Sequence, residues 1–100
     1  MDTRLRAYLF DQVPTTDPAS VLRMNERIAA CYAWAERHGF TVADEIIAWP
    51  DASRPAEQVL AELLQECHRE RAVLLVHSLD VLPGAIPAPW RGVVPLVVAT

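Results

Sequence analysis

The clearest feature of the hydrophobic pattern is an unbroken apolar run from Ala72 to Val76, which has the length of a strand. A helical pattern precedes this run, and the polar residues His77, Ser78 and Asp80 follow it. A strand that is apolar on both faces must be covered on both faces, as the central strand of a parallel sheet is. Ligands of such sheets bind beyond the carboxyl ends of the strands. The three polar residues are therefore the first candidates for a functional site.

Three other segments have strand patterns. Leu5–Asp11 alternates Leu5, Ala7 and Leu9 with Arg6, Tyr8 and Phe10. Phe40–Trp49 takes its apolar content from Val42, Ile46 and Ile47 and has a polar interruption at Asp44 and Glu45. Val93–Ala99 is apolar throughout. Because Pro95 has no amide hydrogen to donate to a neighbouring strand, Val93–Ala99 is predicted to lie at an edge of the sheet.

Two amphipathic helices are predicted between these strands. The first begins at Asp17 and Pro18, where a carboxylate can cap free amides, and it ends before Gly39. Its apolar stripe repeats at spacings of three and four residues: Val21, Met24, Ile28, Cys31 and Ala35. The second helix follows the turn Pro50–Pro55, with Asp51 or Ser53 as its expected cap. Its buried face consists of Val59, Leu60, Leu63, Leu64 and Cys67.

The order strand–helix–strand–helix–strand–loop–strand predicts one α/β domain over residues 1–100. The expected architecture is a small, mostly parallel four-stranded sheet in the order 2-1-3-4, with one helix on each face. Pro83–Gly92 contains three prolines and two glycines, so no helix is expected there. This segment must instead cover the part of one sheet face that the second helix leaves open. The residues that we expect on this partly covered surface are Ile86, Trp90, Val94, Leu96 and Val98.

Exposed apolar patches above a few hundred Å² usually mark interfaces, so this surface predicts a homo-oligomer or a partner protein. The composition, 52% hydrophobic and 22% charged, is that of an ordinary globular chain. Its net charge is −4, and its nine basic residues are arginines scattered along the sequence, which argues against direct DNA binding. No apolar run approaches the roughly 18 residues of a membrane span, and no signal peptide is recognisable. We therefore expect a cytoplasmic protein with no membrane association.

The sequence offers several other kinds of chemistry, and each is disfavoured. His77 and Ser78 are neighbours in a strand pattern and should point to opposite faces, which argues against a hydrolase triad with Asp80. No glycine opens a helix after a strand, as a phosphate-binding loop requires. His38 and His68 are best explained as cations near helix ends. Cys31 and Cys67 are expected on opposite faces of the sheet as buried thiols, and no metal site or cofactor is predicted.

Three segments, read in order, resemble the N-terminal catalytic domain of serine recombinases, the resolvase and invertase family. These segments are Phe10–Pro14, Asp51–Pro55 with the leucine-rich helix after it, and Leu79–Gly84. The agreement extends from about Leu5 to Leu82, about four-fifths of the chain. The resemblance implies a resolvase-like sheet, without the family's later helices and DNA-binding domain.

At the residues that carry this family's chemistry, the sequence departs from its pattern. The attacking serine corresponds to Pro14 and its arginine neighbour to Gln12, whereas Arg54 and Asp80 are retained. Two further arginine positions hold Val81 and Gly84. Covalent attack on DNA needs the serine oxygen and a cluster of arginines around the phosphate. The resemblance therefore implies a catalytically inactive module, not an enzyme, which acts through protein–protein contacts.

A second hypothesis belongs to a different class. The carboxyl ends of the first and third predicted strands bring polar residues toward one edge of the sheet. A pocket formed there by Gln12, Arg54, His77 and Asp80 could serve a small α/β enzyme or a domain that binds a ligand or anion. A ligand at Arg54 and Asp80 would favour this hypothesis. A symmetric interface through the last strand would favour the inactive module that acts through protein–protein contacts.

Overall fold

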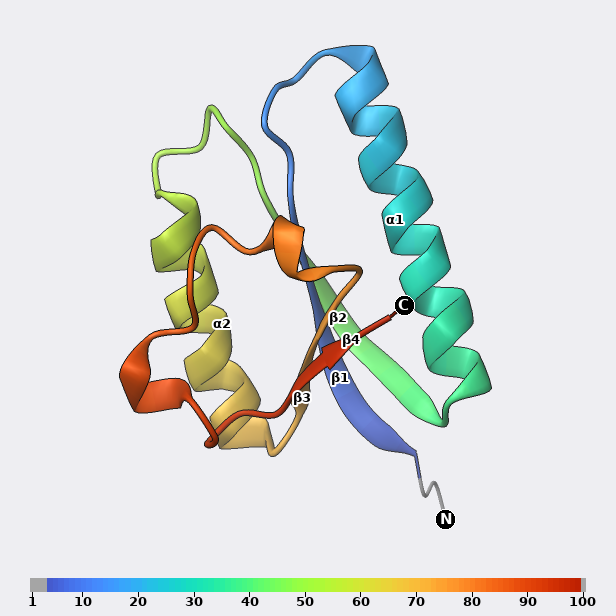
Figure 1. Cartoon of the computed structure of the whole chain (residues 1–100), viewed down its shortest axis with the longest axis vertical. Helices are drawn as coiled ribbons and strands as arrows, with labels where there is room; N and C mark the ends of the chain where they lie inside the picture. The colour runs from blue at the N-terminus through green and yellow to red at the C-terminus, as the bar shows by residue number, and fades with distance from the viewer. Residues whose placement is uncertain (1–3, 100) are drawn as a thin grey trace.

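The computed structural model describes residues 4–99 and confirms the predicted α/β architecture (Figure 1). Four strands form one sheet in the order β2-β1-β3-β4, and each neighbouring pair is parallel. The strands and helices, in chain order, are β1 (Leu5–Gln12), α1 (Pro18–Arg37), β2 (Phe40–Ala48), α2 (Ala56–Glu70), β3 (Val73–Val76) and β4 (Leu96–Val98).

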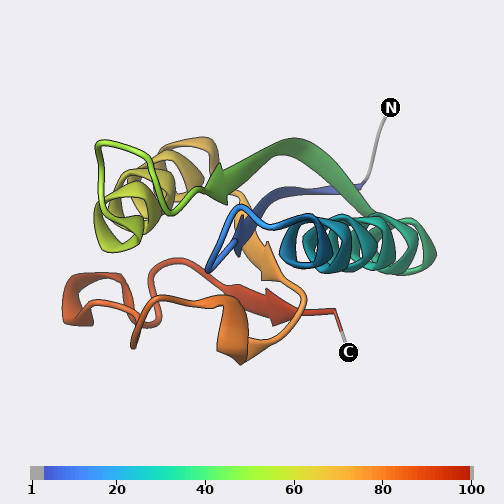
Figure 2. The ribbon, with the colours of Figure 1, turned by 90° about the horizontal axis from the view of Figure 1, so that it is seen from above.

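The two helices lie on opposite faces of the sheet, as predicted (Figure 2). Alternate residues of the central strands serve the two layers: Leu9 and Leu75 pack on the α1 side, and Phe10 and Leu74 on the α2 side. This division follows from the alternation of side chains along a strand. The two cysteines belong to different layers as well, Cys31 to the first and Cys67 to the second, so the expectation of two separated, buried thiols is confirmed.

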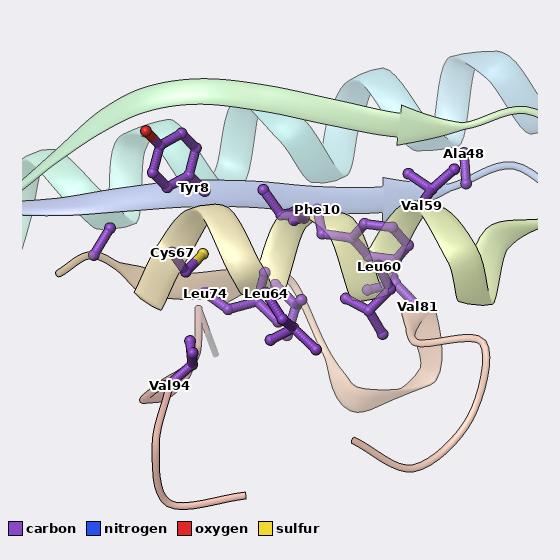
Figure 3. Close-up of a cluster of buried hydrophobic side chains, with 13 residues drawn as sticks. Tyr8, Phe10, Ala48, Val59, Leu60, Leu64, Cys67, Leu74, Val81 and Val94 are labelled. Atoms are coloured by element: carbon purple, nitrogen blue, oxygen red, sulfur yellow. The ribbon is translucent and has the colours of Figure 1, made fainter. Parts of the chain in front are cut away.

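The irregular segment before β4 completes the core on the α2 side. Ile86 and Trp90 are half-buried and pack against the cluster that contains Leu74 and the buried Val94. Figure 3 shows Leu74 and Val94 in this cluster. Trp90 also contacts the ring of His68 at a centroid distance of 5.9 Å. The segment contains the 3-10 turn η2 (Ala88–Trp90), a single turn in which proline is tolerated.

Several element ends differ from the sequence prediction. Asp17 caps α1 as expected, since its Oδ1 accepts the Ser20 amide at 2.9 Å. In contrast, α2 begins after Pro55 without a side-chain cap, so the expected cap at Asp51 or Ser53 was wrong. β4 is limited to Leu96–Val98, because the chain around Val93 and Val94 still belongs to the turn that follows η2.

The polar interruption in β2 has a structural counterpart. The pairing of β2 with β1 shifts register between Val42 and Asp44, so Ala43 is left over as a bulge. A bulge and exposed carboxylates at an edge strand both discourage pairing with another chain. Within residues 4–99, neither helix combines the length and apolar character needed to cross a membrane.

Candidate functional site

A hollow with several polar residues in its lining lies at the carboxyl edge of the sheet, between the ends of β1 and β3. After β1 the chain leaves toward α1 on one face, whereas after β3 it enters the 3-10 turn η1 (Leu79–Val81), which packs on the α2 side. Because the two connections leave toward opposite faces, a crevice remains where the strand order reverses. Its volume is about 540 Å³, and it is lined by Gln12, Pro14, Arg27, His77, Ser78, Asp80 and Val81.

Arg27, one of the residues that line this cavity, forms an ion pair with Asp11. The Asp11 carboxylate is 1% exposed and accepts hydrogen bonds from Nε and Nη2 of Arg27, both at 2.9 Å. The backbone amide of Gln12 also donates a hydrogen bond to Oδ1 of Asp11, at 2.7 Å. The hydrogen bonds with Asp11 raise the pKa of Arg27, so the guanidinium stays charged. The side-on geometry uses Nε and Nη2, and no hydrogen bond among the described residues engages Nη1.

Gln12 ties the two sides of the crevice together. Its side-chain Nε2 donates to the backbone carbonyl of Val81 at 2.8 Å, which links the end of β1 to η1. Val81 is itself buried in the core on the α2 side. The side chain of Gln12 therefore links the end of β1 to the turn that follows β3.

His77 and Ser78 both line the cavity, although the sequence pattern predicted opposite directions for neighbouring residues there. β3 ends at Val76, so the alternation of a strand no longer applies to the residues beyond it. In the described part of the chain, no hydrogen bond joins His77, Ser78 and Asp80 to one another. Together they offer an imidazole, a hydroxyl and a carboxylate to a bound molecule.

A smaller hollow of about 290 Å³ adjoins the first. Its lining is Arg23, Glu26, Arg27 and His77, so Arg27 and His77 belong to both. These two side chains consequently stand between the hollows, accessible from either side. The polar surface available to a ligand extends from η1 to the outer face of α1.

Three of the four residues singled out from the resemblance meet at this cavity: Gln12, Pro14 and Asp80. Arg54 does not join them, because its exposed side chain forms an ion pair with Glu62 of α2. Arg27, which the sequence reasoning missed, supplies the guanidinium instead. A signal was present, since Arg27 lies three residues after Met24 and four before Cys31, on the helix face that meets the sheet.

The expected interface residues are largely covered by their own chain. Val94 is buried, and Ile86, Trp90 and Val98 are half-buried against the α2-side core. Leu96 is 37% exposed, and its neighbour Val93 is 46% exposed. The apolar surface left to a partner on this side is therefore centred on β4 and the residues just before it.

A further hollow of about 530 Å³ lies at the opposite, amino end of β3, near His68, Arg69 and Arg71. Basic residues gather at the end of a helix because they complement its partial negative charge, which explains their presence there. Arg69 is also paired with Glu66. Parallel sheets bind ligands at the other end of their strands, so the crevice between β1 and β3 is the stronger candidate.

The two cysteines supply no reactive thiolate to the crevice between β1 and β3 or to the hollow at the amino end of β3. Burial raises the pKa of Cys31 to about 11 and the pKa of Cys67 to about 12, so both stay protonated near neutral pH. Across residues 4–99, no group of three or more histidine, cysteine or acidic side chains is arranged to hold a metal ion. No family model, curated protein or solved structure matches this chain.

Proposed function

We propose that this protein is a non-catalytic domain that binds a small polar molecule in the crevice between β1 and β3. The observation that supports this most directly is the cavity of about 540 Å³ at the point where the strand order reverses. Cavities of 300–1,000 Å³ are typical of small-molecule sites, and this position is the usual one in open α/β sheets. The Asp11–Arg27 pair and the Gln12–Val81 hydrogen bond hold two of its walls in place.

The proposal of binding without catalysis rests on the residues at the serine recombinase positions. Pro14 stands where the resemblance expects the attacking serine, and it lines the cavity without offering a hydroxyl. Gln12, at the position of an arginine, is engaged with the Val81 carbonyl. If the resemblance is taken as the guide, the absence of the reactive oxygen and of that arginine favours recognition of a ligand over attack on one.

A variant that fills the cavity tests this proposal. Ser78→Phe places a ring in the crevice, and Ser53→Phe places the same ring in the exposed turn before α2. We expect a library of polar metabolites, screened by amide chemical shifts, to yield ligands that perturb Gln12, His77 and Asp80. These ligands should bind the Ser53→Phe protein and not the Ser78→Phe protein. The proposal fails if no compound perturbs these residues, or if the Ser78→Phe protein binds equally well.

The exposed edge of β4 supports a second candidate, the recombinase-like module that acts through protein contacts. β4 pairs with β3 on one side only, and Leu96 and Val93 are exposed beside it. Unpaired edge strands are templates for association with another chain. If the protein acts through this edge, sedimentation should show a dimer of the natural protein, and Leu96→Asp should abolish that dimer. Leu22→Asp, which changes an exposed leucine on α1, should leave the dimer intact. That the protein acts in the cytoplasm stays a prediction.

A further inference from the structure

We infer that the ligand of this crevice is a small zwitterion of the amino-acid class, with a carboxylate bound at Arg27 and an ammonium bound at Asp80. This inference rests on the proposed function and specifies the chemistry of the molecule that the cavity accepts. Both charged residues line the same cavity, one from α1 and the other from η1. The ligand would therefore contact both residues, with its carboxylate toward Arg27 and its ammonium toward Asp80.

Arg27 is prepared to bind a carboxylate. Its Nε and Nη2 are committed to Asp11, which fixes the plane of the guanidinium, and Nη2 also approaches the Gln12 carbonyl at 3.3 Å. No hydrogen bond within residues 4–99 uses Nη1, and since no buried side-chain nitrogen there lacks a partner, Nη1 is accessible to solvent and to a ligand. His77 lines the same wall and has a ring nitrogen that can donate beside it. A guanidinium that is already oriented loses little freedom when it binds an anion.

Asp80 supplies the opposite charge. Its side chain is exposed and forms neither an ion pair nor a hydrogen bond with any other described residue. The hydroxyl of Ser78 lines the cavity close to it in sequence and can accept a second ammonium hydrogen. This carboxylate and hydroxyl are acceptors suited to a primary amine, whereas a second carboxylate of the ligand would be repelled.

The balance of charges separates a zwitterion from other ligands. Arg27 and Asp11 cancel, as do Arg23 and Glu26 in the adjoining hollow, so Asp80 leaves the site with an excess negative charge. A phosphate or dicarboxylate would meet that excess charge. A simple amine would gain nothing from Arg27, and a simple carboxylic acid would gain nothing from Asp80. A molecule with both groups gains an interaction at both residues.

Matched ligands test the inference on the intact protein. The probes are the common amino acids, the corresponding acids without the amino group, the corresponding amines without the carboxyl group, and inorganic phosphate. Titrations followed by amide chemical shifts should show an amino acid binding at Gln12, His77 and Asp80. Because a hydrogen bond to a charged group is lost, removal of either ligand charge should weaken binding by at least about tenfold.

A charge variant sharpens the test. Asp80→Asn should bind the amino acid and the acid lacking its amino group with similar affinity, whereas Asp51→Asn, in the exposed turn before α2, should keep the original preference. If phosphate, a plain acid or a plain amine binds the natural protein as tightly as the amino acid, the zwitterion inference fails and the binding function stands. If neither these probes nor the metabolite library perturb the amide chemical shifts of the crevice residues, the zwitterion inference and the proposed binding function both fail.

Discussion

The buried carboxylate of Asp11 is held by two parallel hydrogen bonds from Arg27, each 2.9 Å long, between the end of β1 and the middle of α1. Asp11 is 1% exposed, so its negative charge has no access to water and depends on this partner. The pair joins the helix to the strand end, and Arg27 also lines the crevice. One interaction therefore serves the stability of the α1 layer and the shape of the candidate site.

Breaking this pair from the arginine side should be costly. Arg27→Met leaves a buried, unpaired carboxylate, and we expect the free energy of unfolding in urea to fall by about 3 kcal/mol. Adding Asp11→Asn to Arg27→Met should recover part of this loss, because the neutral amide costs less to bury than the orphaned charge. Arg23→Met, on the exposed side of the same helix, should change stability by about 0.5 kcal/mol or less. Equal losses in the two arginine variants would contradict the buried-pair explanation.

The framework of the fold could be predicted because it depends on patterns that are local in the sequence. The apolar run Ala72–Val76 identified the central strand, and the stripe of α1 identified the helix face that meets the sheet. Even the covering role of Trp90 followed from counting how much sheet one helix can shield.

The candidate site was only partly predictable, because its partners are distant in sequence. Gln12 and Asp80 could be placed from strand ends alone, whereas the union of Asp11 with Arg27 depends on how α1 is rotated over the sheet. Arg54 was misplaced for a related reason. The turn that carries it directs its side chain toward Glu62 of α2, a nearby carboxylate that the resemblance did not take into account.

The hydrogen bond from Gln12 to Val81 should control the mobility of η1. Gln12→Glu replaces the donating amide with a carboxylate that faces the Val81 carbonyl, so the hydrogen bond at 2.8 Å is replaced by repulsion. We expect faster amide hydrogen exchange at Val81 and Leu82 and weaker binding of any ligand of the crevice. Gln65→Glu, on the exposed face of α2, adds the same charge away from the crevice. It should leave the amide exchange of Val81 and Leu82 and the binding of ligands unchanged. Unaltered exchange in Gln12→Glu would show that the turn does not depend on this contact.

Arg71 offers a route to a more stable protein. It ends α2 in the left-handed conformation, with φ 54° and ψ 42°, where a side chain is strained and glycine is favoured. Arg71→Gly should therefore raise the free energy of unfolding by about 1 kcal/mol. Arg71→Ala removes the guanidinium and keeps the strain, so it should not give this gain. The same increase in both variants would mean that the charge of Arg71, and not its backbone conformation, is the source of the cost.

Asp17 should make the stability of α1 depend on pH in the acidic range. Hydrogen bonds from the Thr15 hydroxyl and the Ser20 amide lower the pKa of Asp17 to about 2 from an ordinary value of 3.8. Because the folded-state pKa lies below the unfolded one, its stabilising contribution is complete above about pH 4 and is lost as the pH falls toward 2. The melting temperature of the natural protein should therefore exceed that of Asp17→Ala at pH 6, and the difference should shrink steadily between pH 4 and pH 2.

Asp17→Asn keeps a capping oxygen without the titrating charge, so its advantage in melting temperature over Asp17→Ala should stay nearly constant across this range. A difference between the natural protein and Asp17→Ala that is independent of pH would show that the charge of this cap contributes nothing.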